Sequence, residues 1–435
     1  MVKIRHAYKN TKIMTFFRIT NDDVIDGRID HVDIGNATII ECNNITTLQY
    51  FPNWENVSNV TCHGCTGLIE LPNWKRVKTV ECKGCTSLTK LPKWKRIKFL
   101  DCSLCPQLTE LPNWRRIEKV KCTNCLLLTH LPNWKMVRFV ECRNCKLLIE
   151  LPKWENVVEV SCSGCDLLNK LPLWPYLEKV FCMDCLNLIG LPNWTIVKVV
   201  NCQGCAGLTE LPDWPEITVV LCSKCTKLTK LPNFPNLNRI DCSECQLLDY
   251  LPNWKYVQTV TCSNCRLLTE LPDWECVQFV ECSNCQLLTK LPNWQCIIVV
   301  ECESCILLTE LPDWDDIVEV NCTDCVSLIK LPEWNIVENV SCNQCVLLTD
   351  IPRWPNIDTL KCQNCPKIQE IEFDHKLERI SYIGCTSLTR VSIPKYYHEK
   401  FFPRIPALDY PSCMVMLQTN FLMRDLQKDT FFWLK

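Results

Sequence analysis

Histidine, net charge and long apolar runs are all scarce in this chain of 435 residues. Its six histidines are scattered, so they form no recurring acid–base or metal-binding cluster. A formal net charge of -2 removes the simplest electrostatic argument for binding nucleic acid or a membrane surface. No apolar stretch is long enough for a membrane-spanning helix, and residues 1–20 lack the apolar run of a secretory signal. We therefore expect a cytoplasmic protein.

The dominant feature of the sequence is a period of twenty residues that runs from 51 to 350 without insertion or deletion. In the copy at 71–90, Val80 and Cys82 lie two apart, so both point to one face of an extended chain. Gly84 follows at a turn position that is mostly Gly, Asn or Asp in the other copies. The Leu-Pro step that opens each copy predicts an extended, polyproline-like or 3-10 back instead of a long helix. A fixed period of this kind predicts a solenoid with one short strand per coil.

The pattern over residues 77–88, Val-x-x-Val-x-Cys-x-x-Cys-x-x-Leu, resembles the strand-and-turn signature of leucine-rich repeats, with Cys in place of the more usual Asn. The resemblance covers eighteen coils, from Ala37 to about Ile393. It implies a leucine-rich-repeat solenoid of the horseshoe class with a parallel β-sheet on the concave side. Coils with Cys-x-x-Cys turns and Leu-Pro-x-Trp backs are most similar to leucine-rich-repeat proteins encoded by giant DNA viruses of amoebae (mimivirus-like). That likeness implies a viral protein in the host cytoplasm or the virion, acting on host partners.

The unbroken period predicts one elongated array with a cap at each end. Residues 1–36 do not fit the period and are predicted to form the N-terminal cap. The array occupies 37–393, and 394–435 are predicted to form a partly helical C-terminal cap. Within that last segment, 413–434 have the spaced apolar residues of a capping helix, and a helix that binds a partner or a membrane is the alternative.

Thirty-seven cysteines would ordinarily indicate a secreted disulfide scaffold. Thirty-two of them form sixteen Cys-x-x-Cys pairs, from Cys62/Cys65 to Cys362/Cys365, always in the same two columns. Because every coil has the same interior hole to fill, reduced core thiols are the favoured interpretation, with disulfides or metal binding as alternatives. We expect no metal and no cofactor. Trp recurs in each full copy except at Phe234, which predicts a stacked aromatic ladder along the backs.

The sequence offers no motif for catalysis. Bacterial leucine-rich-repeat ubiquitin ligases have similar Leu-Pro coils, but they carry a large catalytic cysteine domain after the array, and only the short segment 394–435 follows it here. Cys413 in that segment has no His or Asp partner in a recognisable motif. We therefore expect that the protein is not an enzyme.

The outward strand positions vary from coil to coil, and they predict the functional surface. Several are apolar, as in a surface that binds a protein partner, and the β-propensity of such side chains is the alternative explanation. The candidate partner-binding residues on the concave face are Phe99, Phe139, Phe181, Val199, Val219, Leu221, Phe279 and Val299.

Charge is distributed unevenly along the repeat. Glu and Lys alternate at the end of successive coils, which predicts ion pairs that fix the coil register; the column contains Glu70, Lys90, Glu110, His130, Glu150, Lys170, Glu210, Lys230, Glu270, Lys290, Glu310 and Lys330. A basic stripe marks the early coils and acidic residues the later ones, and a nucleic-acid or phosphoinositide contact is the alternative to a solvated surface. The stripe is Lys75, Arg76, Lys95, Arg96, Arg115, Arg116 and Lys135; the acidic residues are Glu275, Glu301, Glu303, Asp315 and Asp316.

Taken together, these patterns predict a non-catalytic protein-binding scaffold. A structural or virion component and a thiol-rich metal or redox buffer are the alternatives. We expect a protein partner, no membrane contact, and neither nucleic acid nor a small molecule as the usual ligand.

Overall fold

The computed structural model describes residues 15–372, 377–392 and 414–415. The chain divides into two compact units, Met1–Leu221 (unit 1) and Cys222–Lys435 (unit 2). The helix predicted over 413–434 lies outside the described residues, except for Met414–Val415, which form the short strand β22.

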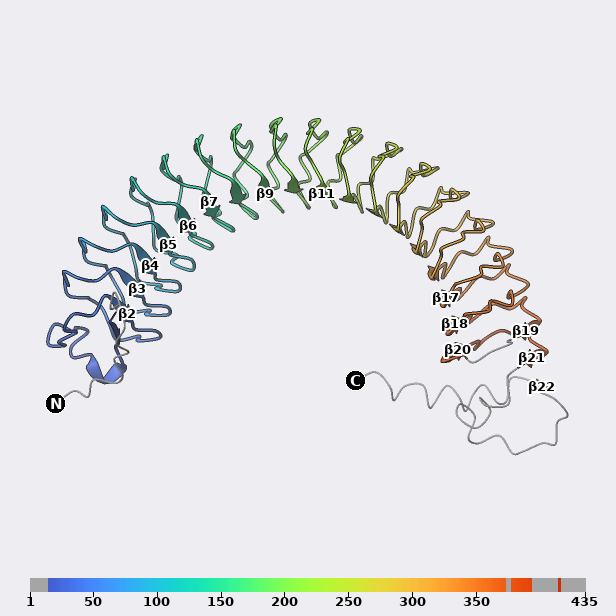
Figure 1. The fold of residues 1–435 in the computed structure, drawn as a ribbon, viewed down its shortest axis with the longest axis horizontal. Coiled ribbons are helices and arrows are strands. Elements are labelled where there is room, and N and C mark those ends of the chain that lie inside the picture. The colour runs from blue at the N-terminus through green and yellow to red at the C-terminus, as the bar shows by residue number, and fades with distance from the viewer. Residues whose placement is uncertain (1–14, 373–376, 393–413, 416–435) are drawn as a thin grey trace. The chain divides into compact units, whose positions relative to one another are not determined.

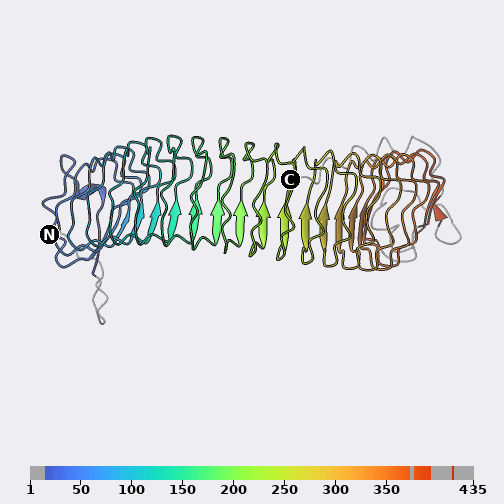
Figure 2. The same ribbon diagram turned by 90° about the horizontal axis from the view of Figure 1, so that it is seen from above.

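Unit 1 is a parallel β-solenoid in which each coil contributes one three-residue strand, coloured blue to green in Figure 1. From Ile39 onward, neighbouring strands pair in parallel at an offset of twenty residues, as where Val80 lies opposite Leu100. Figure 2 shows these strands side by side along the stacked coils. The elements are β1 (Phe16–Arg18), η1 (Asn21–Asp23), β2 (Ile39–Glu41), β3 (Asn59–Thr61), β4 (Thr79–Glu81), β5 (Phe99–Asp101), β6 (Lys119–Lys121), β7 (Phe139–Glu141), β8 (Glu159–Ser161), β9 (Lys179–Phe181), β10 (Val199–Asn201) and β11 (Val219–Leu221).

Unit 2 repeats the same architecture. Its strands are β12 (Arg239–Asp241), β13 (Thr259–Thr261), β14 (Phe279–Glu281), β15 (Val299–Glu301), β16 (Glu319–Asn321), β17 (Asn339–Ser341), β18 (Thr359–Lys361), β19 (Glu370–Glu372), β20 (Arg379–Ser381), β21 (Arg390–Ser392) and β22. Strands β12 to β18 and β20 pair in parallel in that order. A small second sheet forms where the repeat decays, with β21 parallel to β19 and antiparallel to β22.

Short strands pair at both ends of the array, β1 with β2 and β22 with β21. Strand β1 pairs in parallel with β2, so residues ahead of the first coil occupy the edge of that strand. Unpaired strand edges invite association, which is the physical reason for a cap. The assignments of 1–36 and 394–435 as caps stay predictions.

The core consists of the columns that the period places inward. Val77, Val80, Cys82, Cys85 and Leu88 in one coil are all 0% exposed. Because each coil places the same residue types at the same depth, the interior is a set of continuous columns rather than one central cluster.

The turn after each strand requires a left-handed backbone. The φ angle is 77° at Gly84 and 59° at Asn124. Glycine has no Cβ to clash in this region, and Asn tolerates it better than other residues, which explains the composition of the column. Five coils have another residue at this turn with φ of 59–62°, so the fold tolerates side chains that disfavour the conformation: Leu104, Lys224, Glu244, Ser304 and Gln344.

The backs of the coils are extended and turned. Among the described residues the only helix is η1, so the structure selects the extended form over the 3-10 alternative. Within a back, Trp74 N–H donates to the carbonyl of Pro72 at 2.9 Å, a tight turn spanning three residues. The Leu-Pro-x-Trp sequence therefore makes a compact bend where a helix would not fit.

The tryptophans form the predicted ladder. In unit 1, successive indoles from Trp74 to Trp214 stack with centroids 5.9–6.4 Å apart and planes within 15°. In unit 2, those from Trp254 to Trp354 stack at 5.8–6.2 Å. Each indole N–H also reaches the preceding coil, as where Trp154 Nε1 donates to Pro132 O at 3.0 Å. Stacking and hydrogen bonding thus join neighbouring coils on the side opposite the strands.

Candidate functional site

The candidate site is the outward face of the strands. In β9, β10 and β11 the central valines, Val180, Val200 and Val220, are 0% exposed and fill the core. Because side chains alternate along a strand, the residues on either side of each valine point outward. The core thus fixes one residue of each strand and leaves two free to vary.

Four of the predicted site residues meet on this face of unit 1. Val199 lies opposite Val219, and Phe181 and Leu221 flank Asn201 in the parallel column. Asn201 is 8% exposed, and its side-chain oxygen accepts a hydrogen bond from Gln203 N at 3.1 Å. We call Phe181, Val199, Val219 and Leu221 the β9–β11 patch. Asn201 is largely covered and the exposed Lys179 lies opposite Val199, so the patch is an apolar surface with a cation at one corner.

Two further predicted residues lie on β5 and β7, separated by a cation. Strand β6 places Lys119 between Phe99 and Phe139, and its ammonium lies 5.7 Å and 6.0 Å from the two ring centroids. The guanidinium of Arg138 also lies 5.7 Å from the Phe139 centroid. Cations over aromatic faces are mildly stabilising. This part of the face is a mixed cationic and aromatic surface, unlike the β9–β11 patch.

The last two predicted residues belong to unit 2. Phe279 on β14 lies opposite Val299 on β15, and in the neighbouring column Glu281 lies opposite Glu301. Burial raises the pKa of Glu301 above its ordinary value; a hydrogen bond with Asn321 opposes the shift, and the carboxylates Glu319, Glu281 and Glu303 add to it. Phe279 and Val299 therefore lie beside a cluster of carboxylates.

The thiol ladder is part of the core. Cys85 Sγ donates to the carbonyl of Cys62 in the preceding coil at 3.0 Å, and the same bond recurs along both units. A side-chain hydrogen bond with Cys125, and then burial, raise the pKa of the Cys102 thiol. All cysteines in the described residues are free, and only Cys276 and Cys296 are not buried. Within the described part of the chain no group of three or more His, Cys, Asp or Glu residues is placed to hold a metal ion.

The basic stripe lies away from the strand face, and most of the alternating Glu and Lys column is not directly paired. The basic stripe occupies exposed turns on the backs, as at Lys75 and Arg76. Ion pairs between neighbouring coils occur elsewhere, for example Lys98–Glu118 at 2.7 Å and Lys146–Asp166 at 3.0 Å. The structure shows no ion pair within 4.0 Å for nine members of the alternating column, so the predicted direct pairing fails there: Glu70, Lys90, Glu110, Glu150, Lys170, Glu270, Lys290, Glu310 and Lys330.

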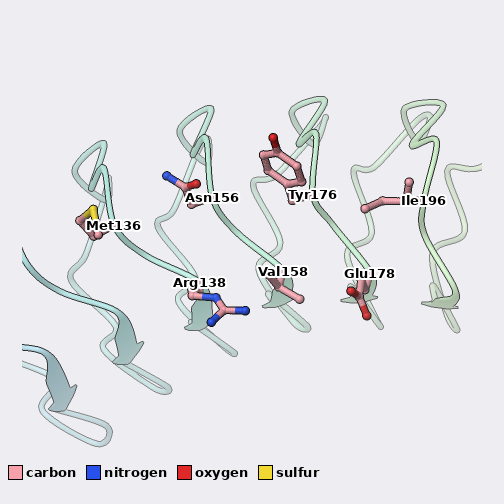
Figure 3. A pocket seen from close by; sticks show the side chains of 7 residues that line it. All are labelled: Met136, Arg138, Asn156, Val158, Tyr176, Glu178 and Ile196. Carbon is pink, nitrogen blue, oxygen red and sulfur yellow. The ribbon is translucent and has the colours of Figure 1, made fainter.

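Sequence reasoning missed a groove of about 470 Å³ on the edge of four successive coils of unit 1 (Figure 3). One row of side chains comes from the turns that precede the strands, and a second row lies closer to the strands. The lining residues are Met136, Asn156, Tyr176 and Ile196 in the first row, and Arg138, Val158 and Glu178 in the second. The signal was present, because Met, Tyr and Ile recur at one turn position that elsewhere is mostly polar.

Within the described residues, no helix has the length and apolarity needed to cross a lipid bilayer. No protein-family model matches the chain, and no curated protein matches it. Among solved structures the chain is similar to a leucine-rich repeat protein from Bacteroides ovatus ATCC 8483, at 14% sequence identity and a TM-score of 0.30. The match covers 81% of this chain and 88% of that one. The assignment to a parallel β-solenoid rests on the stacked, paired strands of the coils.

Proposed function

We propose that the protein is a non-catalytic scaffold that binds a protein partner through the outward face of its strands. One observation carries the proposal: the β9–β11 patch gathers four apolar side chains at positions that the core leaves free. Apolar groups in the middle of a surface are where most of the binding energy of protein interfaces concentrates. The remaining face residues would supply the polar surroundings that set specificity.

The proposal extends to setting and partner. Its support is the resemblance of the Cys-x-x-Cys, Leu-Pro-x-Trp coils to those of leucine-rich-repeat proteins of giant DNA viruses. On this proposal the strand face is concave, the protein acts in the host cytoplasm or virion, and the partner is a host protein.

The test is affinity capture from the host cell, with the double variant Phe181→Asp/Leu221→Asp. The control is Leu173→Asp, which places the same charge on a back residue that is 60% exposed. Introducing buried carboxylates at an interface should cost at least about 2 kcal/mol, or roughly thirtyfold in affinity. We expect the patch variant to lose a defined set of partners that wild type and control both retain. The same partners captured by all three proteins would refute the proposal.

A structural component is the second candidate, and the tryptophan ladder favours it. Continuous indole stacking and N–H donation between coils resist bending of the backs in each unit. An unchanged set of captured partners in the test above would favour this role. The thiol-buffer alternative requires accessible thiolates, and burial of nearly all the described thiols opposes it.

A further inference from the structure

We propose that the groove lined by Met136, Arg138, Val158, Tyr176 and Glu178 binds a polyproline II segment of a partner protein. The segment carries an acidic residue and, three residues further on, a basic one. This site shares no residue with the β9–β11 patch, and Arg138, whose guanidinium lies 5.7 Å from the Phe139 ring centroid, links it to the edge of the strand face.

The apolar wall of the groove is unusually exposed. Met136 is 51% exposed and Tyr176 57% exposed, and both lie in the row farther from the strands (Figure 3). Val158 is half-buried and belongs to the second row, closer to the strands. Grooves lined by aromatic and aliphatic side chains suit polyproline II segments, which are already ordered before binding and therefore lose little entropy.

Opposite charges lie at the two ends of the second row. Arg138 and Glu178 occupy equivalent positions two coils apart, with Val158 between them (Figure 3). Glu178 has one ion pair, to Lys198 at 3.5 Å, in which the side chains are 39% and 54% exposed. Such an exposed pair is worth under about 1 kcal/mol, so the carboxylate can accept a second cation. The groove therefore complements a ligand with an acidic group at the Arg138 end and a basic group at the Glu178 end.

The pitch of the coils matches the spacing of a polyproline II segment. Strands repeat at about 4.8 Å, so two coils span about 9.6 Å. In polyproline II, residues three apart share a face and lie about 9.3 Å apart. An acidic and a basic residue three apart in such a segment therefore lie in register with Arg138 and Glu178.

The experiment measures fluorescence polarisation of labelled proline-rich peptides with the full chain. The first peptide contains Glu-Pro-Pro-Lys, the second Glu-Pro-Lys and the third Lys-Pro-Pro-Lys, each flanked by prolines. We expect wild type to bind the first at least about tenfold more tightly than the other two, a difference of about 1.4 kcal/mol. Equal binding of all three, or binding of none, would overturn the proposal.

Charge exchange in the protein supplies the second arm. Arg138→Glu should lose the Glu-Pro-Pro-Lys peptide and gain the Lys-Pro-Pro-Lys peptide, because both ends are then acidic. The double variant Arg138→Glu/Glu178→Arg should bind the first peptide again, with the peptide reversed. Phe181→Asp/Leu221→Asp should bind it as wild type does, which separates this site from the proposed function. Circular dichroism checks the fold of each variant, and a preference that does not follow the charges would refute the assignment.

Discussion

Replacing Trp154 tests how the coils are held together. Its side chain is 0% exposed, stacks on Trp134 and Trp174 at 6.1 Å and 5.9 Å, and donates Nε1–H to Pro132 O. Trp154→Ala removes both stacks and opens a cavity, which should cost about 3–5 kcal/mol. Trp154→Phe keeps a ring and loses the N–H donor.

Trp154→Phe should cost less than Trp154→Ala, because the carbonyl that accepts the indole hydrogen bond has a second donor. Pro132 O also accepts Trp134 N–H at 2.9 Å, so the carbonyl keeps a partner when the indole is removed. The variant then loses one net hydrogen bond, about 1 kcal/mol, plus part of the ring contact, for a total of about 1–2 kcal/mol. Phe234 at the equivalent position of unit 2 shows that the fold accepts this ring.

The assay combines urea unfolding, followed by circular dichroism, with amide hydrogen exchange over residues 131–170. Exchange is needed because repeat arrays open locally as well as globally. Leu173→Ala, on an exposed back position, is the control and should cost under about 0.5 kcal/mol. The reasoning fails if Phe costs as much as Ala at position 154, or if Ala costs less than about 1 kcal/mol there.

Three further predictions concern thiols, turns and carboxylates. In native protein with Cys413 replaced by Ser, Cys276 and Cys296 should react with a thiol reagent at once and the buried thiols only on unfolding; rapid reaction of many thiols would contradict the packed ladder. Leu104→Gly should stabilise unit 1 or leave it unchanged, because it relieves about 1 kcal/mol of left-handed backbone strain. The control Leu127→Gly relieves no such strain and should destabilise unit 1. Equal losses of stability in urea unfolding for the two variants would refute the strain. The raised pKa of Glu301 means that its protonated form favours the folded state, so this contribution is present at low pH and lost as pH rises through the folded pKa. Glu301→Gln should therefore be more stable than wild type near pH 7 and indistinguishable near about pH 4, and an equal gain at both would show that charge is not the cause.

Much of the fold was predictable because a strict period leaves few solutions. Val80 and Cys82 two apart, a turn former at Gly84 and a Leu-Pro step together predict a short strand, a turn and an extended back in every coil. The buried columns, the indole ladder and the interior position of the thiols were all predicted correctly. Direct pairing in the Glu and Lys column was wrong at nine positions, because spacing in sequence places side chains near one another but does not orient them.

The candidate site was only partly predictable, because spacing in sequence does not orient side chains. Alternation showed that Phe181 and Leu221 point outward, but the register of β9–β11 and the covered side chain of Asn201 were needed to join them with Val199 and Val219 into one patch. Likewise, Lys119 covers the rings of Phe99 and Phe139, which makes two apolar candidates into a mixed surface.

The repeat alone determined which residues are interior, since a twenty-residue coil with one strand can bury only the columns that recur. Tertiary structure decided what the free positions do, because side chains twenty residues apart become neighbours only when the coils stack. The groove between Arg138 and Glu178 shows the difference: its residues come from four coils, and their common edge exists only in the stacked array.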